Sequence, residues 1–139
     1  MIRLCRRPLE SPGRIMTFRI LIAGSRSLTR SALRLLLQEV CGFEVVGESA
    51  DSEELLAQVQ SRHPHVVLLE WGLPGQPGLE LLPLLRERNG RPAVIVLSGR
   101  PELESTVRDA GAHAFFNMGE PPRRLLAALR AIQENRSLA

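Results

Sequence analysis

The sequence predicts an α/β fold in which five parallel strands alternate with five helices and form a doubly wound sheet. Short apolar runs that are rich in β-branched residues and bounded by turn formers are typical of strands buried on both faces. Between these runs, apolar residues repeat at spacings of three and four, as they do on one face of a helix. The alternation of the two patterns along 139 residues favours one domain with helices on both faces of the sheet.

Five segments are predicted to be strands. Residues 20–23, 66–69 and 93–97 are continuous apolar runs that contain valine or isoleucine. Residues 43–46 and 114–116 complete the set. Because helical patterns separate these short segments, they suit a parallel sheet built with right-handed crossovers.

Five helical patterns follow the five strands. Their repeating apolar residues are Leu28, Ala32, Leu35 and Leu36 in the first; Leu55, Leu56 and Val59 in the second; Leu79, Leu82 and Leu85 in the third; Leu103, Val107 and Ala110 in the fourth; and Leu125, Leu126, Leu129 and Ile132 in the fifth. In each helix we expect these residues to form the face that packs on the sheet.

Start and stop signals agree with these helices. Asp51 or Ser52 can cap the second helix, with Glu54 close behind, because a short polar side chain can accept a hydrogen bond from the first free backbone N–H groups. The other signals are Pro121 and Pro122 in the first turn of the last helix, and Asn89, Gly90 and Gly111 at the ends of the third and fourth.

The chain is expected to have three parts: a disordered basic extension over residues 1–16, a globular domain over 17–134 and a frayed C-terminus over 135–139. The formal net charge is +3, and residues 1–15 account for it with four arginines and one glutamate. The arm could touch nucleic acid or an anionic surface. Because the charges of the remaining residues balance, we expect no direct DNA binding by the domain.

Location and cysteine chemistry are predicted from what the sequence contains. No apolar stretch approaches the about 20 residues that a membrane-spanning helix needs, and the first residues lack the apolar core of a secretory signal. We expect no membrane association and a cytoplasmic location. Cys5 and Cys41 lack the spacing of metal ligands, and we expect both to be ordinary thiols.

The candidate site lies at the carboxyl ends of the predicted strands, where open parallel sheets bind their ligands. The central apolar strand ends in Glu70, and a loop rich in glycine and proline follows it over residues 71–75. The loops expected to converge on Glu70 cover residues 24–26, 98–100 and 117–119. By itself this is a sparse set of one carboxylate, two hydroxyls, one amide and several arginines.

Several segments resemble the CheY-like receiver domain of bacterial response regulators over about residues 18–130. The matching segments are residues 20–26 for the first strand, 45–51 for the second strand in its NarL/LuxR-type form, 65–75 for the phospho-acceptor strand, 94–98 for the fourth strand with its switch hydroxyl at Ser98, and 111–115 for the segment with the switch aromatic at Phe115. The resemblance implies a flavodoxin-like (βα)5 sheet with strand order 2-1-3-4-5 and a role in two-component phosphorelay signalling.

The residues that the receiver family uses for its chemistry are replaced in this sequence. The family needs an acceptor aspartate, an acidic pair for Mg²⁺ and a lysine; here these positions hold Glu70, Gly24 with Ser25, and Met118. The chain has eighteen arginines, no lysine and only two aspartates, both at predicted helix ends. Phosphoryl transfer depends on positioning and on neutralising charge, so we predict a pseudo-receiver with no catalytic residue, no cofactor and no bound Mg²⁺.

The environment of Glu70 has two interpretations. A glutamate is one methylene longer than aspartate and can place its carboxylate where a phosphoryl group would lie, which would favour a fixed, active-like conformation. A buried carboxylate needs a partner, and the candidates are Ser25, Ser98, Asn117, Arg26 and Arg100. Alternatively, Glu70 points to water.

The sequence therefore predicts an atypical stand-alone receiver that acts by binding protein partners. In receivers the fourth helix, fifth strand and fifth helix form the usual interface, and a homodimer through this face is one form that the binding could take. Two alternatives stay open. Glu70 could itself accept a phosphoryl group, or the domain could bind a small ligand as other flavodoxin-like domains do.

Overall fold

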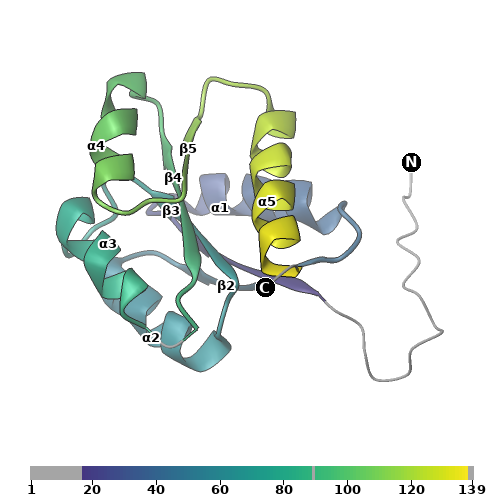
Figure 1. Cartoon of the computed structure of the whole chain (residues 1–139), viewed down its shortest axis with the longest axis horizontal. Coiled ribbons are helices and arrows are strands. Elements are labelled where there is room, and N and C mark those ends of the chain that lie inside the picture. Colours follow the sequence, from purple (N-terminus) through teal and green to yellow (C-terminus); the bar gives the residue numbers. More distant parts are fainter. Residues whose placement is uncertain (1–16, 89, 138–139) are drawn as a thin grey trace.

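A computed structural model describes residues 17–88 and 90–137 (Figure 1). The expected extension, residues 1–16, lies outside the described residues. The elements in chain order are β1 Phe18–Ala23, α1 Ser27–Gln38, β2 Phe43–Ser49, α2 Ser52–Arg62, β3 Val66–Glu70, α3 Gly78–Arg86, β4 Ala93–Ser98, the 3₁₀ turn η1 Pro101–Leu103, α4 Glu104–Asp109, β5 Ala114–Asn117 and α5 Pro122–Ser137. Every predicted strand and helix is present, and each strand is one to three residues longer than predicted.

The sheet is parallel throughout, with strand order β2-β1-β3-β4-β5. This confirms the predicted α/β fold and its 2-1-3-4-5 order. Helices α1 and α5 cover one face of the sheet, and α2, α3 and α4 cover the other (Figure 1). Because all strands run in one direction, the loops that carry the candidate site residues lie at one edge of the sheet.

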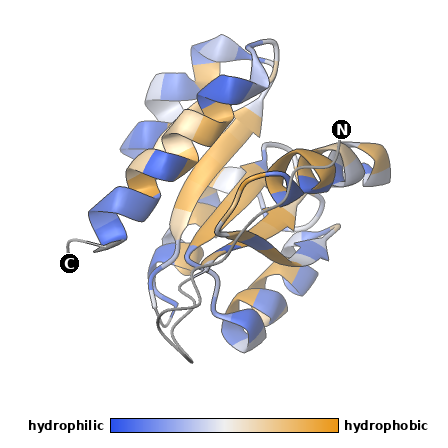
Figure 2. Ribbon diagram, turned by 90° about the vertical axis from the view of Figure 1, so that its right-hand side faces the viewer, coloured by the Kyte–Doolittle hydropathy of each residue, from blue (hydrophilic) through white to orange (hydrophobic). Residues whose placement is uncertain are grey.

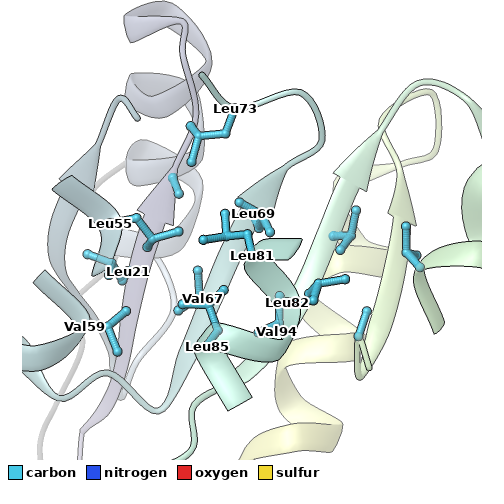
Figure 3. Packing of buried hydrophobic residues seen from close by; sticks show 14 residues of the cluster. Leu21, Leu55, Val59, Val67, Leu69, Leu73, Leu81, Leu82, Leu85 and Val94 are labelled. Atoms are coloured by element: carbon cyan, nitrogen blue, oxygen red, sulfur yellow. The ribbon is translucent and has the colours of Figure 1, made fainter. Parts of the chain in front are cut away.

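Alternate residues of β1, β3, β4 and β5 enter two different cores, because successive side chains point to opposite faces. Leu21 and Val67 join the first core, between the sheet and α2 to α4, whereas Ile20 and Ile22 join the second, under α1 and α5. Figure 3 shows leucines of α3 meeting the strand residues of the first core. Figure 2 shows the apolar strands enclosed by helices whose outer turns are mostly hydrophilic.

The orientation of α1 differs from the prediction. Leu28 and Leu35 were expected on its buried face, but they are 83% and 65% exposed. Leu37 is the buried residue of this helix, and Leu33 and Leu36 pack beside it on the second core. Of the four residues predicted for the buried face, Leu36 packs on the core, whereas Ala32 is exposed like Leu28 and Leu35. The leucines fit two overlapping helical repeats, and contact with the sheet decides which of them is buried.

The predicted start of α2 is confirmed. Asp51 is its N-cap and accepts a hydrogen bond from the Glu54 backbone N–H at 2.8 Å, while the Glu54 carboxylate accepts from the Ala50 N–H at 2.8 Å. Gly111, with φ of +116°, follows the end of α4 as predicted. These local contacts fix both helix boundaries without help from the core.

Two further features concern the chain ends and the cysteines. Helix α5 continues to Ser137, past the predicted domain end at residue 134.

No helix among the described residues is long and apolar enough to cross a membrane. The expectation of an ordinary thiol is wrong for Cys41, which is disulfide-bonded; Cys5 lies outside the described residues.

Candidate functional site

The site is built around the carboxyl end of β3, where Glu70 is the last residue of the strand. The parallel register places Ala23 of β1 opposite Leu69, so Gly24 comes next to Glu70 at the edge of the sheet. On the other side Glu70 lies opposite Leu97 of β4, one residue before Ser98. The sheet itself therefore brings the ends of β1, β3 and β4 together around one half-buried carboxylate.

Glu70 turns toward β1. Its Oε1 atom accepts a hydrogen bond from the backbone N–H of Ser25 at 2.9 Å. A Cβ atom placed on Gly24 would lie 2.9 Å from the same oxygen, closer than ordinary contacts allow. Gly24 thus leaves the space that the longer carboxylate occupies, and the first free amide after β1 satisfies its charge.

A pair of arginines from α1 holds the other side of this loop. Arg30 donates to the Gly24 carbonyl at 2.6 Å and to Glu48 of β2 at 3.1 Å, and Arg34 donates to the second oxygen of Glu48 at 2.6 Å. The hydrogen bond from Arg34 lowers the pKa of the Glu48 carboxyl most strongly, and that from Arg30 lowers it further, against the opposing effect of burial. Glu48 therefore stays charged and fixes both guanidinium groups.

Sequence reasoning did not identify Arg30, Arg34 and Glu48 as parts of the site. A signal was available, because Arg30 and Arg34 are four residues apart and so share one face of the first helix. Glu48 lies close to the end of the second predicted strand. A pair of cations on a helix beside the carboxylate of a neighbouring strand indicates an ion pair near the loop that connects them.

The remaining candidate partners of Glu70 have other contacts. Among the described residues, the hydrogen bond to the Glu70 carboxylate comes from the Ser25 amide. Ser98 is buried, and its hydroxyl accepts from the Arg100 N–H at 3.1 Å; the exposed Arg100 side chain pairs with Glu102 at 3.2 Å. The end of the fourth strand is therefore bonded within its own loop.

The end of β5 is also self-contained. Asn117 accepts from the Gly119 N–H at 3.0 Å, so its amide oxygen is engaged in the turn. Met118 is 40% exposed, and Arg26 is an exposed residue that precedes the first turn of α1. Phe115 is half-buried and packs against the first core.

The described residues at this edge offer few ligands for a divalent metal. Mg²⁺ needs several hard oxygen ligands, normally including carboxylates. Positions 24 and 25 supply no carboxylate, and the Oε1 atom of Glu70 already accepts a hydrogen bond from the Ser25 N–H. The guanidinium of Arg30 lies on the Gly24 carbonyl and would repel a cation there. Nowhere among the residues that the structure describes do three histidine, cysteine or acidic side chains gather as a metal site would require.

A groove of about 380 Å³ runs along α4, β5 and α5 next to this edge. Two ion pairs border it, Arg108 with Glu104 at 3.0 Å and Arg124 with Glu120 at 3.1 Å. Its lining residues are Pro101, Glu104, Arg108, Phe115, Phe116, Asn117, Glu120, Arg124 and Ala128. The aromatic floor between charged rims is suited to a protein surface of mixed polarity.

Comparison with known proteins decides the family. Residues 20–130 match the response regulator receiver domain. The chain belongs to the receiver family. The nitrate/nitrite response regulator NarL of Escherichia coli K12 is 31% identical over 112 residues, which are 79% of this chain and 52% of NarL. The response regulator UvrY of the same strain is 27% identical over 115 residues, which are 81% of this chain and 53% of UvrY.

Solved structures agree with this receiver fold. A LuxR-family two-component response regulator from Aurantimonas sp. SI85-9A1 is 25% identical, with a TM-score of 0.77 and 86% of each chain covered. RcsB of Salmonella enterica serovar Typhimurium shares the fold, with 24% identity and a TM-score of 0.78. The matched region is 85% of this chain and 61% of the RcsB chain. The receiver spans about half the length of the curated relatives it matches, and it is a module of two-component signalling.

Proposed function

We propose that this receiver signals without standard aspartyl phosphorylation and acts by binding a protein partner. The observation that carries the proposal is the contact between Glu70 and the Ser25 amide beside Gly24. The carboxylate occupies the loop where the receiver family places its acidic pair, and a backbone N–H satisfies it. In this proposal Glu70 is a structural residue of the loop rather than the acceptor of a phosphoryl group.

The charge distribution at the site supports this proposal. Transfer of a phosphoryl group requires cations that neutralise its oxygens in the transition state. The receiver family uses Mg²⁺ and a lysine, but here the position of the lysine holds Met118, and Arg30 is already bonded to Glu48 and the Gly24 carbonyl. No cofactor enters the proposed function.

The output of the proposed receiver is an interaction through the α4-β5-α5 face. The groove on this face places Phe115 and Phe116 between two ion pairs, and an apolar centre with a polar rim is the usual arrangement of a protein interface. A signalling protein or a second copy of the receiver is the partner, and direct contact with DNA is not part of the function. The cytoplasm is the proposed location, as is usual for the receiver family.

Intact-mass measurement after incubation with Mg²⁺ and acetyl phosphate tests the proposal. We expect no added phosphoryl group on the wild-type protein. A variant that restores the family's residues, G24D/S25D/E70D/M118K, should gain one phosphoryl group, provided that its thermal unfolding shows a folded protein. A stable mass gain on the wild-type protein that disappears in Glu70→Gln would contradict the proposal and identify Glu70 as an acceptor.

The interaction face is tested separately. Light scattering coupled to size-exclusion chromatography measures whether the receiver forms a dimer as its concentration rises. If the dimer uses the groove, Ala128→Glu should abolish it, because a carboxylate would be placed among the groove's aromatic residues. A dimer that survives this change, while thermal unfolding is unaltered, would contradict the assignment of the face.

A further inference from the structure

A second pocket lies at the opposite end of the sheet from Glu70. Its volume is about 510 Å³, within the range of small-molecule sites, and it is lined by Pro83, Arg86, Glu87, Arg91, Pro92 and His113. These residues come from α3, the segment before β4 and the segment before β5. The amino ends of β4 and β5 therefore form its base, far from the family's phosphorylation site.

The two arginines of this pocket form no ion pair among the described residues, unlike five other arginines of the protein. Arg30, Arg34, Arg100, Arg108 and Arg124 each form an ion pair at 2.6–3.2 Å. Within residues 17–88 and 90–137, by contrast, neither the Arg86 nor the Arg91 guanidinium forms an ion pair with an acidic side chain. Glu87 is the single carboxylate in the lining, so the pocket keeps an excess of positive charge.

His113 adds a hydrogen-bond donor to this lining. Its Nδ1 atom accepts from the Val94 backbone N–H at 3.2 Å, which places the proton of the neutral ring on Nε2. Burial lowers the pKa of His113, and the charges of Arg136 and Arg86 lower it further. In the neutral ring the Nε2–H can donate to a ligand in the pocket.

The backbone and α5 hold the pocket in shape. Arg91 has a left-handed conformation with φ of +41° directly before Pro92, and its carbonyl accepts from the Arg136 side chain at 2.8 Å. Arg86 lies against Gly111, where a Cβ atom would be 2.7 Å from its Cδ atom. These contacts set the backbone of Arg91 and place the side chain of Arg86 beside Gly111.

We propose that this pocket binds a small phosphate-bearing molecule. A guanidinium fork matches two oxygens of a phosphate group in plane, and Arg86, Arg91 and the His113 N–H together offer donors to several oxygens. Glu87 opposes an anion, but the two arginines outnumber it, and the remaining positive charge attracts a multiply charged anion more strongly than a singly charged one. Pro83 and Pro92 supply an apolar wall for the rest of the molecule. The inference is independent of the proposed function at Glu70.

Titration with inorganic pyrophosphate tests the proposal. Isothermal calorimetry measures the binding, and the NMR shifts of His113 report whether it occurs at this pocket. We expect saturable binding of one pyrophosphate per chain. The double variant Arg86→Gln with Arg91→Gln should weaken it by about tenfold or more, equivalent to about 1.4 kcal/mol. The matched control removes two exposed arginines at the carboxyl end of the sheet, Arg26→Gln with Arg123→Gln, and should bind pyrophosphate as the wild type does.

Three outcomes would overturn the proposal. Pyrophosphate could fail to saturate at millimolar concentration, or it could bind equally to the Arg86/Arg91 variant and the wild type while both unfold at the same temperature. The third outcome concerns the source of the phosphate. A short DNA duplex that binds with the same dependence on Arg86 and Arg91, when pyrophosphate does not, would assign the surface to nucleic acid.

The single variant Arg91→Lys keeps the positive charge but loses the two-pronged guanidinium group. Its affinity for pyrophosphate should lie between those of the wild type and the double variant.

Discussion

The two ends of the sheet differ in how their charged side chains are paired. At the carboxyl end, Glu70 is bonded to the Ser25 amide, and Arg30 to the Gly24 carbonyl and Glu48. At the amino end, Arg86 and Arg91 line a pocket with one carboxylate. The end that the receiver family uses for phosphate is thus internally neutralised, whereas the opposite end keeps uncompensated cations. The comparison teaches that one sheet can hold charged side chains in closed networks at one end and leave them open to a ligand at the other.

The largest effect is expected from loss of Arg30, the central connection at the carboxyl end. Arg30→Ala removes hydrogen bonds to the Gly24 carbonyl and to charged Glu48, and should lower the free energy of unfolding by about 2 to 3 kcal/mol. Urea denaturation measures the change. Arg26→Ala, on an exposed residue of the same loop, is the control and should change stability little. Equal effects of the two variants would contradict the role of Arg30 as the connection that holds this loop.

A smaller effect is expected at Glu70 itself. Glu70→Ala leaves the Ser25 N–H without its charged acceptor and should cost about 1 to 2 kcal/mol. Glu70→Gln keeps an oxygen at the same reach and should cost less than Glu70→Ala. Thermal unfolding of the three proteins under one set of conditions gives the order. If Glu70→Ala were as stable as the wild type, the carboxylate would not be fixed by the loop.

The amino end should be sensitive to acid through His65, whose Nδ1 accepts from the Arg19 N–H at 2.9 Å and whose ring stacks on Phe18. Burial lowers its pKa from the ordinary 6.5, and Arg136 and Arg19 lower it further. The unfolded chain therefore binds a proton at a higher pH than the folded one. The stability that His65 contributes is present above pH 6.5 and is lost as the pH falls through the folded-state pKa.

Urea denaturation between pH 8 and pH 5, spanning about three units around the histidine range, measures this dependence. His65→Phe keeps the stacking but removes the acceptor, so it should cost about 1 kcal/mol at pH 8 and reduce the slope with pH. His113 contributes in the same direction, because its pKa is also lowered by burial and by Arg136 and Arg86. An unchanged slope in His65→Phe would show that the titration lies elsewhere.

The smallest effect is expected on the rim of the α4-β5-α5 groove. Arg108 and Glu104 form an i,i+4 pair at 3.0 Å with about half of each side chain exposed. Solvent screens such pairs, so Arg108→Ala should change the free energy of unfolding by only about 0.5 kcal/mol. Denaturation at low and high salt measures it. A loss comparable to that of Arg30→Ala would mean that this rim is as tightly bonded as the site around Glu70.

The fold could be predicted from the sequence because its signals are local and repeated. Continuous apolar runs identify strands buried on both faces, and the cap at Asp51 identifies a helix start without any knowledge of the core. The face of α1 could not be predicted in this way. Leu28 and Leu35 fit a helical repeat as well as Leu33 and Leu37 do, and contact with the sheet decides between them.

The candidate site was predictable in position but not in its bonds. The carboxyl end of a central strand places Glu70 correctly, since strand direction alone fixes that edge. The partner of Glu70 is a backbone N–H, which every residue except proline has, so residue type carries no signal for it. The role of Arg30 depends on the way in which α1 crosses β1 and β2, and this is a property of packing.

Ser25 is an exposed residue whose amide is nonetheless committed to an oxygen of the neighbouring strand. Its deuterium uptake therefore reports on Glu70 rather than on solvent access, because the N–H is released only when the carboxylate leaves. One backbone amide thus serves as a built-in sensor of the loop, which can be followed at equilibrium in the unmodified protein.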